Sequence, residues 1–253
     1  MRLFVGALGN KLNGGTGRSG IAFTHDDTGR TPSIADYYRS YGNANGWKAT
    51  IMMNNFNSSH YADVTTLVNG GCELGNHTTT HYEFVDAYVA ANGAQAYYNN
   101  YVQGVEPQIE NFSQTQPFSF AWPFGNFNQL AFDYIRDTGK YGIIRNYSAR
   151  EYPPSIPAST ALYGGGHEAG AMTLEEYYGA FAIDLDMHKE FMRYALNNDL
   201  VYITISHDIK DRGTFNPTTE LATATEDLNA LVDYANQIGL SIITLKEAYN
   251  LYL

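Results

Sequence analysis

The sequence predicts an α/β fold built as one barrel of alternating strands and helices. Short apolar runs alternate with longer segments of helical periodicity along almost the whole chain. A length of 253 residues suits one such barrel. No internal repeat, low-complexity linker or break in composition marks a domain boundary. We therefore expect residues 1–253 to form a single domain.

The strand candidates are the short apolar runs, and the helix candidates lie between them. The expected strands are 2–8, 20–25, 48–54, 72–76, 118–123, 141–146, 201–207 and 241–245. The expected helices are 33–44, 61–69, 84–112, 128–138, 186–198 and 222–238. Because strands alternate with helices of this length, we expect parallel pairing with crossover helices.

Local signals support several of these boundaries. Ser33 follows Pro32 and is the expected N-cap of the first helix, and glycines stand where three helices should end: Gly70, Gly139 and Gly239. Residues 147–185 break the rhythm, because they are rich in Pro, Gly and Tyr. We interpret them as a loop insertion that contacts substrate or acts as a lid.

Composition excludes several classes of function. The chain has 15 basic and 26 acidic residues, a net charge of −11 and no Lys/Arg-rich run, which argues against nucleic acid or an anionic membrane as partner. No stretch approaches the roughly 18 apolar residues of a membrane span. Cys72 is the only cysteine, so no intramolecular disulfide can form. We expect a secreted or cell-envelope protein whose leader has been removed, with a cytoplasmic location as the alternative; the sequence predicts no oligomeric state.

Polar residues follow most of the predicted strands. In barrels of this class, the residues that perform chemistry lie at the C-terminal ends of the strands. The residues found there are His25-Asp26-Asp27, Asn54-Asn55, Asn76-His77, Pro123-Phe124-Gly125, Arg145-Asn146 and His207-Asp208. This concentration of His and Asp is the strongest functional signal in the sequence.

Two histidines at this edge have the spacing of metal ligands. His77 and His81 are four residues apart, so in a helical turn their imidazoles would share one face and could bind one cation. Two solvated histidines on a surface helix are the alternative. A carboxylate at the end of a neighbouring strand would complete an open metal site.

These residues together resemble the polysaccharide deacetylases of carbohydrate esterase family 4, the NodB-homology fold. The family motif Thr-Phe-Asp-Asp-Gly is similar to residues 24–28, and His-(Ser/Thr)-x-x-His matches residues 77–81 in full. The Pro-Tyr-Gly and Leu-x-His motifs resemble residues 123–125 and 205–207. The four motifs occur in family order. The resemblance implies the distorted (β/α) barrel of this family.

The resemblance also implies a division of roles. Asp27, His77 and His81 would bind a divalent metal, most often zinc in this family, with cobalt or nickel as alternatives. Asp26 would act as general base toward a water molecule at the metal. The backbone N–H of Phe124 would help to hold the oxyanion, and His207 would protonate the leaving group.

The chain departs from the family pattern at several positions. His25 and Thr28 replace the usual Phe and Gly, and we expect His25 to point away from Asp26 and to pack in the core. Ala121 stands where the family has an arginine that orients the catalytic aspartate. Arg145, at the end of the next strand, could reach the same carboxylate; an ordinary surface ion pair is the alternative.

The aspartate that tunes the catalytic histidine in this family has no obvious counterpart, and Asp184 and Asp186 are the candidates. Trp122, Phe124 and Tyr147 are the candidates to line a sugar groove.

The resemblance thus implies hydrolysis of N- or O-linked acetyl groups of a polysaccharide or oligosaccharide, such as an N-acetylglucosamine polymer or acetylxylan. Two alternatives stay open. One is a non-catalytic carbohydrate-binding relative that keeps the metal site, and the other is hydrolysis of a small molecule on the same fold.

Overall fold

The structure is a computed structural model that describes residues 17–147, 155–157, 167–175, 185–216 and 219–251. The strand expected at 2–8 lies outside these residues. All the predicted catalytic and metal-binding residues lie within them.

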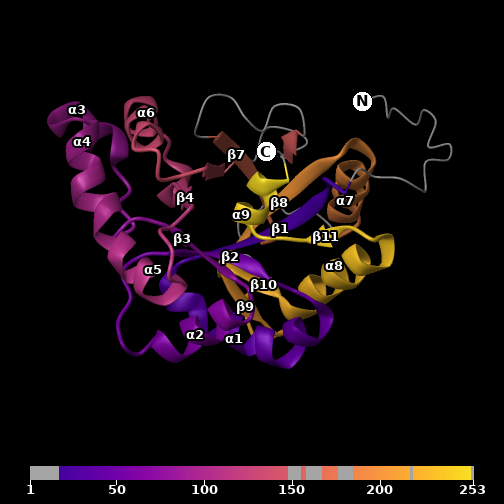
Figure 1. The fold of residues 1–253 in the computed structure, drawn as a ribbon. Helices are drawn as coiled ribbons and strands as arrows, with labels where there is room; N and C mark the ends of the chain where they lie inside the picture. Colours follow the sequence, from indigo (N-terminus) through magenta and orange to yellow (C-terminus); the bar gives the residue numbers. More distant parts are fainter. Residues whose placement is uncertain (1–16, 148–154, 158–166, 176–184, 217–218, 252–253) are drawn as a thin grey trace.

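Seven parallel strands form a closed barrel (Figure 1). In spatial order they are β1 (Gly20–Asp26), β2 (Ala49–Met53), β3 (Glu73–Asn76), β4 (Ser119–Ala121), β5 (Ile143–Tyr147), β7 (His167–Thr173) and β8 (Leu200–Ser206). Strand β8 pairs with β1 over six residues and closes the ring. The short β11 (Ser241–Ile242) pairs with the start of β1, and β6 (Ser155–Pro157) runs antiparallel to β8. The barrel prediction is confirmed.

The segment 147–185 is not simply an inserted loop. Residues 167–173 form β7, which lies between β5 and β8 and pairs in parallel with both. Its buried alanines, Ala169 and Ala171, pack inside the barrel. The sequence of β7, HEAGAMT, lacks the apolar run by which the other strands were predicted.

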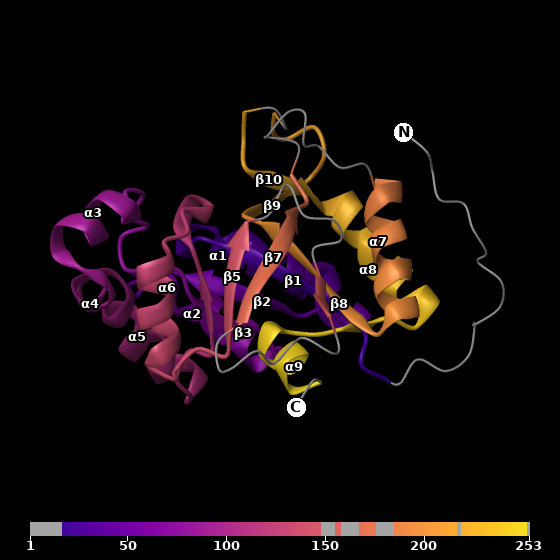
Figure 2. The ribbon, with the colours of Figure 1, turned by 90° about the horizontal axis from the view of Figure 1, so that it is seen from above.

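Helices cover the outside of the barrel. They are α1 (Thr31–Tyr37), α2 (Tyr61–Asn69), α3 (Val85–Asn92), α4 (Ala94–Tyr97), α5 (Glu106–Ser113), α6 (Gln129–Asp137), α7 (Leu185–Asn198), α8 (Thr225–Ile238) and α9 (Leu245–Asn250). Figures 1 and 2 show α7 and α8 together on one side of the barrel and α3 to α6 on the other. A two-stranded sheet, β9 (Asp208–Lys210) and β10 (Ala222–Ala224), follows β8. No helix among the described residues is long and apolar enough to cross a membrane.

Three helix predictions need correction. Residues 222–224 of the helix expected at 222–238 form β10, and α8 begins at Thr225. The segment 84–112 is not one helix, because Gly93 adopts a φ of 85° that breaks it between α3 and α4. The first helix begins at Thr31, so Ser33 lies inside it, and the Ser33 hydroxyl donates to Asp208. The predicted helix ends at Gly70 and Gly239 are confirmed.

Side chains of β1 alternate between the barrel interior and the surrounding helices. Ala22 packs in the interior with residues from β8, whereas Ile21 and Phe23 belong to the core beneath the outer helices. By the same alternation, Asp26 belongs to the interior and His25 to the outer layer. Leu245 and Ala248 of α9 belong to the interior cluster, and Figure 2 shows α9 at the end of the barrel away from the arrowheads of β5 and β7.

Candidate active site

The C-terminal ends of the barrel strands bring the predicted residues together. Asp26 and Asp27 lie at the end of β1, His77 and His81 follow β3, Phe124 follows β4 and His207 follows β8, whereas Arg145 is the third of the five residues of β5 and does not close it as expected. The parallel direction of all the barrel strands places these ends on one side of the barrel.

Asp27, His77 and His81 form a group that could hold a metal. One ligand atom from each lies within 4.8 Å of the others. The two histidine Nε2 atoms are 3.0 Å apart, and His81 Nε2 is 3.6 Å from Asp27 Oδ1. Two nitrogens bound tetrahedrally to one zinc ion lie about 3.3 Å apart, as zinc–nitrogen bonds of about 2.0–2.1 Å require. The residues present therefore fit a small divalent cation.

The tautomer of His77 suits this role. Its Nδ1 lies 3.0 Å from the carbonyl oxygen of Ala121, which can only accept a hydrogen bond, so Nδ1 carries the proton. The lone pair is then on Nε2, the atom that faces His81. Burial lowers the pKa of His77, against the opposing charges of Asp26 and Asp27, which keeps the ring in the neutral form that binds metals.

The loop that carries the histidines is not helical. His77 and His81 meet because Thr78 and His81 adopt positive φ angles of 65° and 53°. The expected helical turn is wrong, although the pairing that it predicted is present. Asn76 accepts a hydrogen bond at Oδ1 from the Thr78 N–H at 2.8 Å and so stabilises the turn.

A buried network holds Asn76 in turn. Its Nδ2 donates to Val102 O at 2.9 Å and to the Tyr141 hydroxyl at 2.7 Å. That hydroxyl donates to Glu106 Oε1 at 2.9 Å, and Lys140 Nζ lies 2.5 Å from Glu106 Oε2. The chain of hydrogen bonds thus runs from the turn of the metal-binding loop to an ion pair on α5.

Asp27 is fixed by a contact that explains Thr28. Asn54 Nδ2 donates to Asp27 Oδ1 at 3.0 Å. Thr28 holds Asn54 by two hydrogen bonds, from its N–H to Asn54 Oδ1 at 2.9 Å and from its hydroxyl to Asn54 O at 2.8 Å. Thr28 therefore orients Asn54, and Asn54 in turn orients the carboxylate of Asp27.

Asp26 forms a buried ion pair with Arg145. Arg145 Nη2 lies 2.5 Å from Asp26 Oδ1 and 2.6 Å from Oδ2, and both side chains are almost fully buried. Burial alone would raise the pKa of Asp26, but the charge of Arg145 and its hydrogen bonds to the carboxylate outweigh burial and lower this pKa to about 2. The surface ion pair that was the alternative for Arg145 is therefore wrong.

The register of the strands explains how Arg145 reaches this aspartate. Ala121 on β4 is the direct partner of Arg145 on β5. Ala121, at the position where the resemblance led us to expect an arginine, carries only a methyl group and belongs to the interior cluster. The guanidinium thus reaches Asp26 from the neighbouring strand.

The partner of His207 is Glu175, which the sequence analysis missed. Glu175 follows β7 and is 2% exposed. His207 Nδ1 lies 3.0 Å from Glu175 Oε2, and the His207 N–H donates to Oε1 at 2.6 Å. Asp184 lies outside the described residues, and the side chain of Asp186 on α7 is 94% exposed. Glu175 therefore takes the place expected of these aspartates.

Glu175 determines the charge of His207. Burial lowers the pKa of this histidine, but the hydrogen bond and the charge of Glu175 outweigh burial and raise it to about 9. The charges of Asp26 and Asp27 act in the same direction. His207 is therefore protonated at neutral pH, whereas Asp26 is ionised.

His25 and the aromatic candidates have distinct surroundings. His25 is fully buried against Trp47, with ring centroids 5.7 Å apart, and burial lowers its pKa to about 4. Trp122 is also buried and cannot line a sugar groove. Phe124 has a φ of 55°, is 58% exposed and packs against His81 at a tilt, with ring centroids 4.4 Å apart. The Tyr147 side chain lies outside the described residues.

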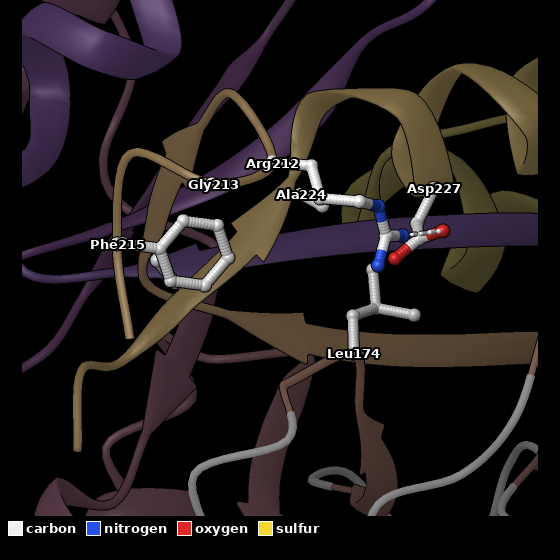
Figure 3. A pocket seen from close by; sticks show the side chains of 7 residues that line it. Leu174, Arg212, Gly213, Phe215, Ala224 and Asp227 are labelled. Atoms are coloured by element: carbon white, nitrogen blue, oxygen red, sulfur yellow. Dashed lines mark hydrogen bonds and ion pairs between the residues drawn. The ribbon is translucent and has the colours of Figure 1, made fainter. Parts of the chain in front are cut away.

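A small pocket lies beyond Glu175, between β10 and the loop that follows β9 (Figure 3). Leu174 and Phe215 contribute apolar groups to it, and Arg212 pairs with Asp227 at its edge, at 2.6 Å. Its volume of about 50 Å³ has room for a few water molecules only. A sugar ring does not fit there.

Comparison with known proteins identifies the family. The sequence model described as polysaccharide deacetylase matches residues 13–143, just over half of the chain. A family 4 acetyl xylan esterase from Clostridium thermocellum, solved with cobalt, has a TM-score of 0.58 at 17% identity, over 91% of this chain and 90% of that one. A peptidoglycan deacetylase from Bacillus subtilis has a TM-score of 0.52 at 14% identity, over 92% and 91%.

A third similar structure is a family 4 pseudoenzyme from Bacillus anthracis, with a TM-score of 0.55 at 13% identity, over 91% of this chain and 65% of that one. No curated protein sequence matches the chain. At these identities the structural likeness shows the fold, and the sequence model shows the family. The chain belongs to the polysaccharide deacetylase family.

Proposed function

We propose that this protein is a divalent-metal-dependent hydrolase that removes N- or O-linked acetyl groups from a polysaccharide or oligosaccharide. Asp27, His77 and His81 would hold the metal, for which zinc is our first choice and cobalt or nickel the alternatives. Substrate polymers of this kind lie outside the cell or in its envelope, and we expect the protein to act there.

One observation carries the proposal: an ionised carboxylate and a protonated histidine share one site with the metal-ligand group. Arg145 keeps Asp26 ionised, and Glu175 keeps His207 protonated. A base and an acid with separated pKa values are what hydrolysis by general acid–base catalysis requires.

The metal, when bound, would polarise a water molecule and lower its pKa toward neutrality. Asp26 would accept a proton from that water as its oxygen attacks the acetyl carbonyl carbon. The Phe124 N–H would donate to the oxyanion of the tetrahedral intermediate. His207 would give its proton to the sugar nitrogen or oxygen as the bond to the acetyl carbon breaks and acetate leaves.

The alternative is a carbohydrate-binding relative without activity, a reading favoured by the likeness to a pseudoenzyme. Acetate release from acetylated xylan and chitooligosaccharides, with and without a chelator, distinguishes the two. We expect release that the chelator abolishes and that zinc, cobalt or nickel restores. Asp26→Asn is the control for contaminating activity. No release from any substrate after reconstitution would overturn the proposal.

A further inference from the structure

A groove opens between the start of α3 and the turn that follows β4. Residues 83–87 and 125–127 line it, and its volume is about 490 Å³. Grooves and pockets that hold small ligands usually enclose about 300–1,000 Å³. This groove, here called the α3 groove, is therefore large enough for a sugar ring.

The α3 groove adjoins the candidate metal site. One wall begins at Glu83, two residues after His81, and the other begins at Gly125, directly after Phe124. The rings of His81 and Phe124 are in contact between the two walls. Asn126 Nδ2 donates to Glu83 O at 2.7 Å, so the walls are tied together beside the site.

Aromatic rings are exposed where the groove meets the site. Phe84 lines the groove and is 63% exposed, and Phe124, which directly precedes the lining residue Gly125, is 58% exposed. A single exposed apolar residue is ordinary, so Phe84 is of interest because it lines a groove that begins next to the candidate metal site. Aromatic faces offer rigid area for packing, which the C–H face of a sugar ring can use.

The polar groups of the groove are acidic. Glu83 and Asp86 carry carboxylates, and none of the described residues that line the groove is basic. Asn128 Nδ2 donates to Asp86 Oδ1 at 2.7 Å and holds this carboxylate in place. The groove would therefore repel a carboxylate on a sugar and attract an ammonium group or hydroxyl donors.

We infer that the α3 groove binds the sugar unit next to the acetylated one, and that it prefers neutral or amino sugars to uronic acids and other carboxylate sugars. The inference rests on the proposed function, because it makes the groove an extension of the deacetylation site.

The first test measures oligosaccharide binding by calorimetry, which does not depend on turnover. The probes are the tetramer of glucosamine and xylotetraose, neither of which carries an acetyl group that could be hydrolysed, added to the zinc-loaded full chain. Phe84→Ala should weaken binding about five- to tenfold, as loss of an aromatic anchor does. Leu130→Ala is the matched control, because Leu130 on α6 is equally exposed, at 65%, and does not line the groove.

Equal affinity of Phe84→Ala and wild type, or no binding of either probe to wild type, would overturn the inference. Acetate release from oligosaccharides by both proteins at the same KM would refute the groove and leave the proposed function standing. If oligosaccharide binding depended on Phe84 but the protein released no acetate, the proposed function would be refuted and sugar binding in the groove would stand.

The second test addresses charge. Wild type should bind a neutral tetrasaccharide more tightly than one that contains a uronic acid, and the preference should shrink as salt is added. Glu83→Gln should reduce the preference about threefold, whereas Glu190→Gln on the distant α7 should not. An unchanged preference in Glu83→Gln would refute the charge selection.

Discussion

Replacing Glu175 by Gln tests how the candidate general acid is charged. Gln keeps the size of the side chain and an oxygen that can accept the His207 N–H, but it removes the negative charge that raises the pKa of His207 to about 9. Burial then lowers this pKa with only the charges of Asp26 and Asp27 against it, so the pKa should move from about 9 toward the ordinary histidine value of about 6.5. The acid form should therefore be lost at a lower pH.

The size of the effect follows from these pKa values. At pH 8.5, about three quarters of the wild-type His207 is protonated but only about 1% of the variant's, so kcat/KM should fall roughly 50- to 100-fold. At pH 6 the variant is still mostly protonated, and the two rates should agree within about twofold. A rate loss that grows with pH separates a charge effect from damage to the fold.

The assay is acetate release by the zinc-loaded enzyme from pH 5 to pH 10, with thermal unfolding measured to confirm the fold. Glu190→Gln, on the exposed face of α7, is the control for removal of a carboxylate. A basic limb that stays within about half a pH unit of the wild-type limb would refute the reasoning.

Three further predictions concern residues on the other side of the site. Asp26→Asn should abolish turnover and retain zinc in a metal titration, whereas His81→Ala should lose both; loss of zinc from the first variant would mean that the two adjacent aspartates have the opposite roles. Arg145→Lys should lower kcat at least tenfold, because a flexible and more strongly hydrated ammonium orients the carboxylate less rigidly than the planar guanidinium, and a rate within about twofold of wild type would exclude an orienting role. Tyr141→Phe removes the hydroxyl between Asn76 and Glu106 and should weaken zinc affinity about tenfold; a folded variant with wild-type affinity would show that the network serves stability alone.

The parts of the site that were predicted are those with a local sequence pattern. Paired aspartates after a strand and two histidines four residues apart are recognisable without a structure. Their geometry was less accessible, because the histidine loop turns through positive φ angles instead of a helix. The four-residue spacing of His77 and His81 thus predicted that the two imidazoles meet, although the helical turn on which that prediction was based is absent.

The parts that were missed depend on neighbours that are distant in sequence. Glu175 follows β7, whose sequence carries no apolar run, so nothing local marks its end. The contact of Arg145 with Asp26 depends on Ala121 being its partner across β4 and β5. The sequence shows that the strand at 118–123 lacks the expected arginine and that the next strand contains one. Only the strand register shows that Ala121 and Arg145 are direct partners.

The buried pair of Asp26 and Arg145 also bears on whether the protein is an enzyme or a binding module. Burying two charged side chains costs a large desolvation free energy. Replacing a buried ion pair by apolar residues of similar volume is therefore often neutral, or stabilises the fold by about 1–4 kcal/mol. The double variant Asp26→Leu with Arg145→Met should therefore have a free energy of unfolding equal to or higher than that of wild type, and it should still bind zinc and oligosaccharide. It should release no acetate. A binding module would gain nothing from retaining the charged pair, whereas a hydrolase needs the ionised carboxylate for the proton that it accepts. If the double variant were several kcal/mol less stable than wild type in denaturant unfolding, the pair would have a structural role, and its presence would no longer favour catalysis.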